Sequence, residues 1–229
     1  MRPLRKVAIG LWIAVFLFAG LRFGLDWNPG AVDQTVNTTD DSNVDFTVKL
    51  QEPVSDQDTA QGLGVGDPLP AIVLNDARGT SQPLSQWSGR TLLINFWATW
   101  CAPCRKEMPL LEQFQQSQSP GRMQVIGIAI DRRDPVLQFI GETGVTYPNL
   151  VGEMDATRAA EQIAPGFALP LSVVVAPSGT ILAIHMGELS AEDLGQIAAV
   201  ADGLATGTLT VAVAPSHLKL GKDVEGTGP

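Results

Sequence analysis

The sequence predicts an α/β domain built on a mixed sheet that is flanked by helices, and three observations lead to this class. Apolar segments of strand length alternate with amphipathic segments of helix length over residues 91–142, as in parallel strands joined by helices. Two apolar segments, 171–176 and 180–186, enclose a Pro-Ser-Gly turn and predict an antiparallel pair. A short hairpin with strands at 71–74 and 82–84 is expected to lead the domain.

The first long strand and the helix after it have the clearest patterns. Residues 91–97 form a nearly continuous apolar run, which is typical of a central strand covered on both faces. A helix is expected over residues 102–116, because Met108, Leu111 and Phe114 recur on one side of it and would pack on the sheet. The other positions of this helix are expected to carry its polar side chains, namely Arg105, Lys106, Glu112 and Gln115.

The remaining elements continue the alternation. They are expected as a strand over residues 123–130 and helices over 134–142, 155–163 and 190–204. Asp134 followed by Pro135 is typical of a helix start, with proline at the first helical position. Ser190 and Asp193 have the spacing of a capping box and predict the start of the last helix.

Composition divides the chain into four parts. These are an N-terminal membrane anchor or signal segment (1–25), an acidic extracytoplasmic linker (26–65), the α/β domain (66–205) and a C-terminal tail (206–229). Residues 44–50 of the linker and 209–213 of the tail are each expected to add one strand. The formal net charge of −9 argues against nucleic-acid binding, because phosphates require a cationic surface.

The N-terminal segment has the features of a membrane anchor. Arg2, Arg5 and Lys6 precede an apolar run over residues 7–25 in which Arg22 is the one charge. As a helix this run would reach about 28 Å, close to the thickness of the hydrocarbon core. No Ala-x-Ala pattern follows it, so an uncleaved anchor is favoured over a removed signal. The positive-inside rule then places the rest of the chain outside the cytoplasm.

Cys101 and Cys104 are the two cysteines of the chain, and they follow the predicted central strand directly. If residue 102 begins a helix, their α-carbons lie about 5 Å apart, which suits a disulfide. Cys101 would then occupy the helix N-terminus, where unpaired N–H groups stabilise a thiolate. Cys104, one turn further in, is expected to be more buried. This asymmetry separates an attacking thiol from a resolving thiol.

Four other roles for the cysteines compete with redox exchange. A structural zinc site needs four ligands, but His185 and His217 lack paired spacing and no second cysteine pair exists. A purely structural disulfide would close a very short loop and add little stability. Redox exchange is therefore favoured, and capture of Cu(I) by the two thiolates is the main alternative. A peroxidase is disfavoured because nothing near Cys101 supplies a second signature of that chemistry.

Residues 96–109, Phe-Trp-Ala-Thr-Trp-Cys-Ala-Pro-Cys-Arg-Lys-Glu-Met-Pro, resemble the thioredoxin superfamily, and specifically the membrane-anchored TlpA/ResA-type thiol-disulfide oxidoreductases. The resemblance extends over about residues 66–204. It implies a thioredoxin-like three-layer sandwich with an N-terminal β-hairpin extension, and a helical insert between Cys104 and Pro170. It also implies protein disulfide or dithiol substrates, a membrane thiol-disulfide electron donor, and no cofactor beyond the redox-active Cys101–Cys104 pair.

The resemblance, taken with the residues themselves, implies three catalytic roles. Cys101 would attack a partner disulfide, and Cys104 would then displace the partner. Glu107 lies three residues after Cys104 on the same helical face and would relay the proton, in keeping with the thiol-tuning role of the matching Glu in the family. A solvated helix charge is the alternative. Ordinary thioredoxin has a buried acid in the preceding strand, where this chain has Asn95, and this difference favours Glu107 as the relay.

The expected substrate-binding residues surround the cysteines. Pro170 would be a cis proline that faces the disulfide, as the resemblance implies, and with Leu169 it would offer backbone pairing to an extended substrate. Trp100 is expected to form an apolar rim, with Ala102 and Pro103 completing the set. Two further residues are expected to be structural, namely Trp97 in the core and His185 in a strand.

The function favoured by these observations is thiol-disulfide oxidoreduction on the extracytoplasmic (periplasmic) face of the bacterial inner membrane. A reductase of exported protein disulfides is expected, with cytochrome c precursors awaiting haem attachment as one substrate class. An oxidase or isomerase would use the same cysteines, because the direction depends on the reduction potential. A non-enzymatic Cu(I)-binding module is the alternative from another class.

Overall fold

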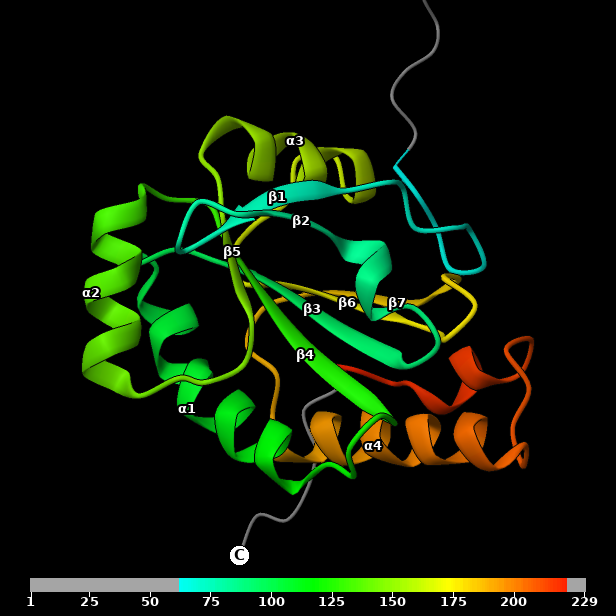
Figure 1. Cartoon of the computed structure of the whole chain (residues 1–229). Helices are drawn as coiled ribbons and strands as arrows, with labels where there is room; N and C mark the ends of the chain where they lie inside the picture. Colours follow the sequence, from blue (N-terminus) through cyan, green and yellow to red (C-terminus); the bar gives the residue numbers. More distant parts are fainter. Residues whose placement is uncertain (1–61, 222–229) are drawn as a thin grey trace, which may run out of the picture. The chain divides into compact units, whose positions relative to one another are not determined.

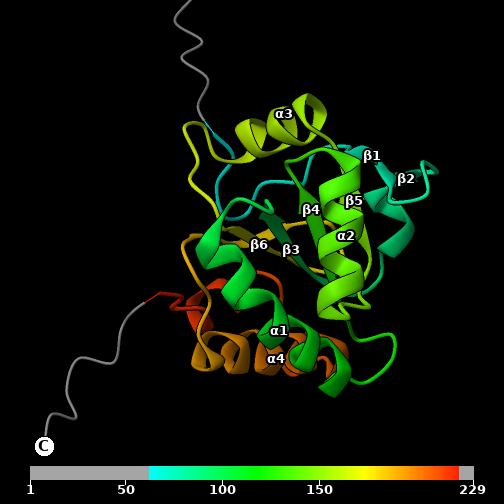
Figure 2. The same cartoon turned by 90° about the vertical axis from the view of Figure 1, so that its left-hand side faces the viewer.

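A mixed seven-stranded sheet lies between two layers of helices in the computed structural model, which describes residues 62–221 (Figure 1, Figure 2). The expectations for the anchor (1–25), for residues 26–61 of the acidic linker with their strand at 44–50, and for residues 222–229 of the tail lie outside the described residues. The strands are β1 (Val73–Asp76), β2 (Ser81–Pro83), β3 (Thr91–Trp97), β4 (Met123–Ala129), β5 (Asn149–Val151), β6 (Leu171–Val175) and β7 (Ile181–Met186). The helices are α1 (Ala102–Ser117), α2 (Arg133–Thr143), α3 (Met154–Ile163) and α4 (Ala191–Thr206), with short 3-10 helices η1 (Leu84–Trp87) and η2 (Ala214–His217).

The sheet has the order β2-β1-β5-β4-β3-β6-β7 and combines both kinds of pairing, as predicted. Strands β3, β4 and β5 are parallel, whereas β6 pairs antiparallel with β3 and with β7. The leading hairpin is confirmed, since β1 pairs antiparallel with β2. Because the parallel strands run in one direction, their carboxyl ends meet at one edge of the sheet. The chain leaves β3 at this edge and enters the cysteine segment.

Strand β3 is buried along its whole length, which confirms the expectation of a central strand. Successive side chains of a strand point to opposite faces. Leu93 and Trp97 accordingly belong to the core formed with α1, α2 and α4, whereas Ile94 and Phe96 belong to the core formed with α3 and the hairpin. Figure 2 shows α1 and α4 below the sheet, α3 above it and α2 in front of it. Burial of an aliphatic side chain such as Leu93 or Ile94 contributes roughly 1.5–3 kcal/mol to folding.

The predicted capping box at the start of α4 is present. The hydroxyl oxygen of Ser190 accepts a hydrogen bond from Asp193 N at 3.1 Å, and Ser190 N donates to Asp193 Oδ2 at 2.8 Å. Two N–H groups that a helix start would leave unpaired are satisfied in this way. The capped helix continues to Thr206, although Gly195 lies in its interior.

Two elements that follow β4 in the chain differ from prediction. Strand β5 was not expected, because three residues are too few for an apolar pattern to identify; it forms by pairing with β4 on one side and β1 on the other. Helix α2 begins at Arg133 with Arg132 as its N-cap, so Asp134 does not cap it and Pro135 is its third residue. Proline is tolerated at that position, because the first four N–H groups of a helix have no partner within it.

The placement of Glu112 on the polar side of α1 was wrong. Its side chain is buried and accepts hydrogen bonds from Thr146 N at 2.8 Å and Tyr147 N at 3.4 Å. Burial tends to raise the pKa of Glu112, but these bonds and those from the Thr146 hydroxyl and Gln116 outweigh it and lower the pKa. Glu112 therefore fixes the segment that leads into β5.

The predicted strand at residues 209–213 does not form. This stretch and η2 pack along α4 instead, with Ala214 fully buried. Gly203 permits the approach, because a Cβ atom there would lie 2.5 Å from Leu209 Cδ1.

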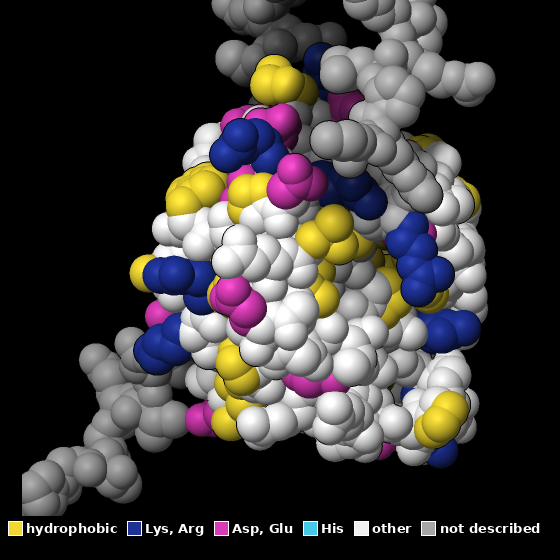
Figure 3. Space-filling view, turned by 60° about the vertical axis from the view of Figure 1, so that its left-hand side comes forward, with side chains coloured by type: hydrophobic (Ala, Val, Ile, Leu, Met, Phe, Trp, Pro, Cys, Tyr) yellow, Lys and Arg dark blue, Asp and Glu magenta, His cyan; other side chains and the backbone are white. Residues whose placement is uncertain are grey.

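The surface of the described part mixes charges of both signs. Figure 3 shows Lys and Arg side chains between Asp and Glu side chains on one face, with hydrophobic side chains in small groups among them. Among the helices of residues 62–221, none has the length and apolarity needed to cross a bilayer.

Candidate active site at the Cys101–Cys104 disulfide

Cys101 and Cys104 form a disulfide at the start of α1, with their α-carbons 5.3 Å apart. Cys101 is the N-cap residue, and its sulfur accepts a hydrogen bond from Cys104 N at 3.3 Å. Pro103 is accommodated at the second helical position, where its missing N–H is not needed. The predicted spacing and the predicted placement of Cys101 at the helix N-terminus are both confirmed.

The two cysteines differ in access to solvent. Cys101 is 5% exposed and Cys104 is 1% exposed, whereas the neighbouring Trp100 is 68% exposed. The expected order of burial is therefore correct. Cys101 nevertheless lies at the edge of the protein surface and does not project from it.

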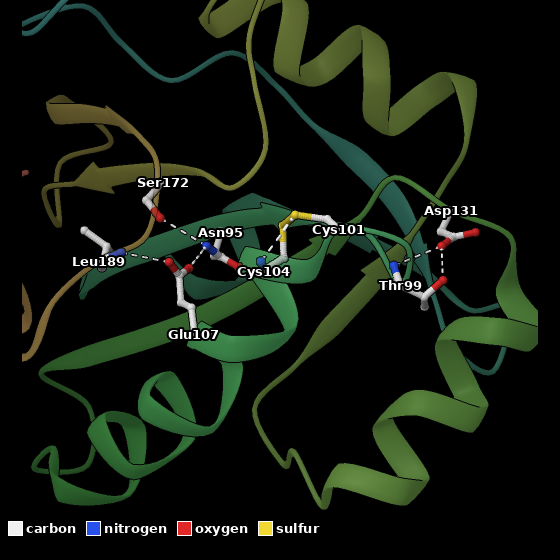
Figure 4. Close-up of a disulfide and its surroundings, with 8 residues drawn as sticks. All are labelled: Asn95, Thr99, Cys101, Cys104, Glu107, Asp131, Ser172 and Leu189. Carbon is white, nitrogen blue, oxygen red and sulfur yellow. Dashed lines mark hydrogen bonds between the residues drawn. A yellow bond between two sulfur atoms is a disulfide. The ribbon is translucent and has the colours of Figure 1, made fainter.

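The loop that carries Trp100 into the helix is anchored to the end of β4. Ile130 N donates to Trp97 O at 2.8 Å, which continues the parallel pairing past the end of β3. Thr99 N then donates to Asp131 Oδ2 at 3.0 Å, and the Thr99 hydroxyl donates to the same oxygen (Figure 4). The position of the disulfide is thus set by two neighbouring strands.

Glu107 lies one turn after Cys104 and is 3% exposed, so it is not the solvated helix charge that was the alternative reading. Its Oε2 accepts a hydrogen bond from Leu189 N at 2.8 Å, and its Oε1 accepts one from Asn95 Nδ2 at 2.6 Å (Figure 4). Burial raises the pKa of Glu107 to about 7; the two hydrogen bonds lower it in part, and the charge of Glu188 raises it further. A carboxyl group with such a pKa can take up and release a proton near neutral pH.

Asn95 connects Glu107 to the opposite side of the site. It is fully buried in β3, and strand alternation places it on the same face as Leu93 and Trp97, toward α1. Its Nδ2 also donates to the Ser172 hydroxyl oxygen at 3.1 Å, across the β3–β6 pair. From the sequence, Asn95 is distinguished only as a departure from ordinary thioredoxin, and no role is predicted for it.

An open apolar groove of about 550 Å³ borders Cys101. Its lining includes Cys101 and four of the predicted substrate-binding residues, Trp100, Ala102, Pro103 and Leu169. It also includes three residues that were not predicted, Ile130, Phe167 and Ala168. The Leu169–Pro170 bond is cis, as the resemblance implied, and Pro170 itself is buried. Phe167 lies three residues before that proline, and this position could have predicted a place for it in the groove.

The two residues expected to be structural are placed as predicted. Trp97 is fully buried, and its Nε1 donates to Asn149 Oδ1 at 3.0 Å. His185 lies in β7.

Comparison with known proteins decides the family. The Redoxin family matches residues 64–201, which is more than half of the chain. The chain belongs to the Redoxin family. Relatives of this Redoxin protein include two named thiol-disulfide oxidoreductase ResA, one from Geobacillus kaustophilus and one from Bacillus subtilis. The first is 27% identical over 58% of this chain and 75% of its own length, and the second is 26% identical over 57% and 72%.

Two solved structures agree with this assignment. A thiol:disulfide interchange protein of the thioredoxin family from Chlorobium tepidum is 28% identical, with a TM-score of 0.54 over 61% of this chain and 99% of that one. A secreted thiol-disulfide isomerase from Corynebacterium glutamicum is 28% identical, with a TM-score of 0.51 over 57% and 82%. The predicted thioredoxin-like fold and TlpA/ResA-type membership are therefore confirmed, and this Redoxin protein is a thiol-disulfide oxidoreductase.

Proposed function

We propose that this protein is an extracytoplasmic, membrane-tethered reductase of protein disulfides in which Cys101 attacks, Cys104 resolves and Glu107 accepts the proton of Cys104. The observation that carries the proposal is the buried Glu107 carboxyl, whose pKa is raised to about 7, one helical turn after the buried member of the cysteine pair. A solvated charge at this position would contribute nothing to proton transfer in the interior.

The first step is attack on a substrate disulfide by the reduced protein. The thiolate of Cys101 is stabilised by the unpaired N–H groups at the start of α1. A substrate segment lying in the groove would contact Trp100 and Leu169, and the apolar lining suits apolar side chains next to the substrate cysteine. The Cys101 sulfur bonds to one substrate sulfur, and the other substrate sulfur leaves as a thiolate.

The second step releases the substrate. Cys104 loses its proton to Glu107, and the resulting thiolate attacks the Cys101 sulfur of the mixed disulfide. The Cys101–Cys104 bond forms, the bond between Cys101 and substrate breaks, and the substrate leaves with both sulfurs reduced. Two electrons pass from protein to substrate, so no cofactor is needed. The disulfide in the structure corresponds to the oxidised product of this cycle.

The proposed location and electron donor rest on the N-terminal segment of the chain. The basic and apolar N-terminal segment supports an anchor with the Redoxin domain outside the cytoplasm, fed with electrons by a membrane thiol-disulfide donor. Exported proteins with disulfides are then the substrate class, and cytochrome c precursors are one member of it. The relatives named thiol-disulfide oxidoreductase ResA support the chemistry of this assignment.

Three experiments test the proposal. Cys104→Ala removes the resolving thiol, so we expect exported proteins to accumulate as mixed disulfides on Cys101, where mass spectrometry identifies them. The direction is tested by equilibrating the protein with a glutathione buffer, because known dithiol proteins span about −270 to −120 mV. A potential at the oxidising end of that range would overturn the reductase assignment. Turnover of insulin disulfides by metal-free protein would exclude the Cu(I)-binding alternative as the main function.

A further inference from the structure

The side-chain amide of Asn95 has one oxygen whose partner the oxidised structure does not supply. Asn95 is fully buried, and its Nδ2 donates to both Glu107 Oε1 and Ser172 Oγ. No donor among the described residues reaches its Oδ1. Buried polar atoms are nearly always paired, so an unpaired acceptor at a reacting centre indicates a partner that is present in another state.

The direction of this oxygen identifies the partner. Asn95 projects from β3 toward α1, the helix that carries both Cys104 and Glu107. In Figure 4 the amide nitrogen faces Glu107, and the amide oxygen points away from it, to the side where Cys104 lies. Cys104 is bonded to Cys101 in this structure and therefore has no proton to donate.

We infer, building on the proposed function, that Asn95 Oδ1 accepts a hydrogen bond from the Cys104 thiol in the reduced protein. Once the proton of Cys104 is on Glu107, the side-chain amide flips, and its Nδ2 then stabilises the Cys104 thiolate. Asn95 is thus a positioning residue for the resolving step.

Each orientation of the amide matches one protonation state. With Glu107 ionised and Cys104 as a thiol, Nδ2 donates to the carboxylate and Oδ1 accepts from the S–H group. With Glu107 protonated and Cys104 as a thiolate, Oδ1 accepts from the carboxylic acid and Nδ2 donates to the sulfur. An amide, which has both a donor end and an acceptor end, can serve both states, whereas a carboxylate or an apolar side chain cannot.

The other neighbours of Glu107 are compatible with both states. The Ser172 hydroxyl can accept from Nδ2 in one orientation and donate to Oδ1 in the other. Leu189 N donates to the second carboxyl oxygen throughout. The charged or titratable groups that act on this region are Glu188, which is paired with Lys106 at 2.8 Å, and the buried Tyr147, whose pKa is raised by burial and by Glu107 and Glu112. Neither hydrogen-bonds to the amide among the described contacts.

The proton and electron balance of the resolving step is unchanged by the amide. One proton moves from Cys104 to Glu107, one S–S bond forms between Cys104 and Cys101, and the bond between Cys101 and the substrate breaks. The leaving thiolate takes up a proton from water. Asn95 neither gains nor loses a proton and acts only through its hydrogen bonds.

A two-phase thiol assay tests the inference. The reduced full-length protein is mixed with dithiobis(nitrobenzoate), which releases a coloured thiolate when Cys101 attacks and a second when Cys104 resolves. We expect Asn95→Leu to slow the second phase by about tenfold or more and to move its inflection from near pH 7 to higher pH, because the hydrogen bond from Asn95 lowers the pKa of Glu107, while the first phase stays within about twofold of wild type. Asn149→Leu, which removes another buried amide from the same sheet, is the matched control and should leave the second phase within about twofold.

The outcomes separate this inference from the proposed function. A wild-type protein that releases no second equivalent defeats the proposed function itself. A normal second phase in Asn95→Leu overturns the role of Asn95 alone. Should that variant not fold, NMR of the reduced wild-type protein decides: the side-chain amide resonances of Asn95 are expected to shift in the same pH interval as the carboxyl carbon of Glu107, and amide resonances that ignore that titration overturn the inference.

Discussion

The backbone N–H of Leu189 donates a 2.8 Å hydrogen bond to the buried carboxyl of Glu107, although 82 residues separate them in the chain. The loop after β7 thus fixes the orientation of an acid that α1 carries beside the disulfide. The same loop is tied to the cis-proline segment, because Gly187 N donates to Pro170 O at 2.9 Å. A single loop therefore connects the proton-accepting side of the site with its substrate-binding side.

Glu107→Gln is expected to slow the resolving step without affecting the attacking step. Glutamine keeps the shape of the side chain and an acceptor for Leu189 N, but it cannot take up the proton of Cys104. We expect the second phase of the two-phase thiol assay to fall by about 10²-fold near pH 7, with the first phase within about twofold of wild type. An unaltered second phase at every pH would exclude Glu107 as the proton acceptor.

The stability of the protein should fall as pH rises through neutrality because of Glu107. Its folded-state pKa is raised to about 7, so the folded state binds this proton more tightly than the unfolded state does. The stabilisation is complete below about pH 4.5 and is lost as pH rises through 7, with a total of about 3 kcal/mol. Urea unfolding at a series of pH values should show this decline in the wild type and a flatter curve in Glu107→Gln. Glu142→Gln, at an exposed position of α2, should keep the wild-type decline.

Glu112→Ala is expected to destabilise the fold by about 2–3 kcal/mol at pH 7, because it leaves the N–H groups of Thr146 and Tyr147 without their acceptor. The pKa of Glu112 is lowered, so its contribution is present above the unfolded-state pKa and is lost as the pH falls. Denaturant unfolding at pH 7 and at pH 3 should therefore show a larger difference between wild type and variant at the higher pH. Gln113→Ala, at the exposed neighbouring position of α1, should cost less than about 0.5 kcal/mol.

Asp131→Ala is expected to loosen the loop that leads into Cys101. Thr99 loses the acceptor for its backbone N–H and its hydroxyl, so the attacking thiol is held less firmly in its reactive position. We expect the first phase of the thiol assay to slow by about three- to tenfold. Asp134→Ala, at an exposed position in the first turn of α2, is the control and should react like wild type. Equal rates in all three proteins would show that the loop does not depend on Asp131.

Two glycines of α4 should respond to alanine in opposite ways. A Cβ atom at Gly195 meets nothing within 4 Å, so Gly195→Ala should stabilise the helix by about 0.5–1 kcal/mol. A Cβ atom at Gly203 would lie 2.5 Å from Leu209 Cδ1, so Gly203→Ala should destabilise by about 1–3 kcal/mol and detach the segment after α4. Thermal unfolding of the two variants gives the comparison. A stabilised Gly203→Ala would mean that the segment packs less closely than described.

The sequence was sufficient for elements with long or repeated patterns. The continuous apolar run of β3, the capping box at Ser190 and the placement of the cysteine pair at a helix N-terminus each follow from residues close together in the chain. The cis form of the Leu169–Pro170 bond was predicted from family resemblance alone, because no local pattern of residues determines it.

The features that could not be predicted depend on partners far away in the chain. Strand β5 exists because two neighbouring strands pair with it. Glu112 is buried against Thr146 and Tyr147, whose backbone N–H donors lie 34 and 35 residues further on. The pairing of Asn95 with Glu107 and Ser172 likewise requires the register between β3 and β6. Periodicity within one element carries no information about such contacts.

Mass spectrometry of single-cysteine variants after reaction with dithiobis(nitrobenzoate) distinguishes the attacking cysteine from the resolving cysteine. We expect Cys104→Ala to form a stable adduct on Cys101 and to release one equivalent of coloured thiolate, whereas Cys101→Ala in the native state should react slowly because Cys104 is buried. Rapid formation of an adduct on Cys104, with Cys101 unreactive, would show that Cys101 is not the attacking thiol.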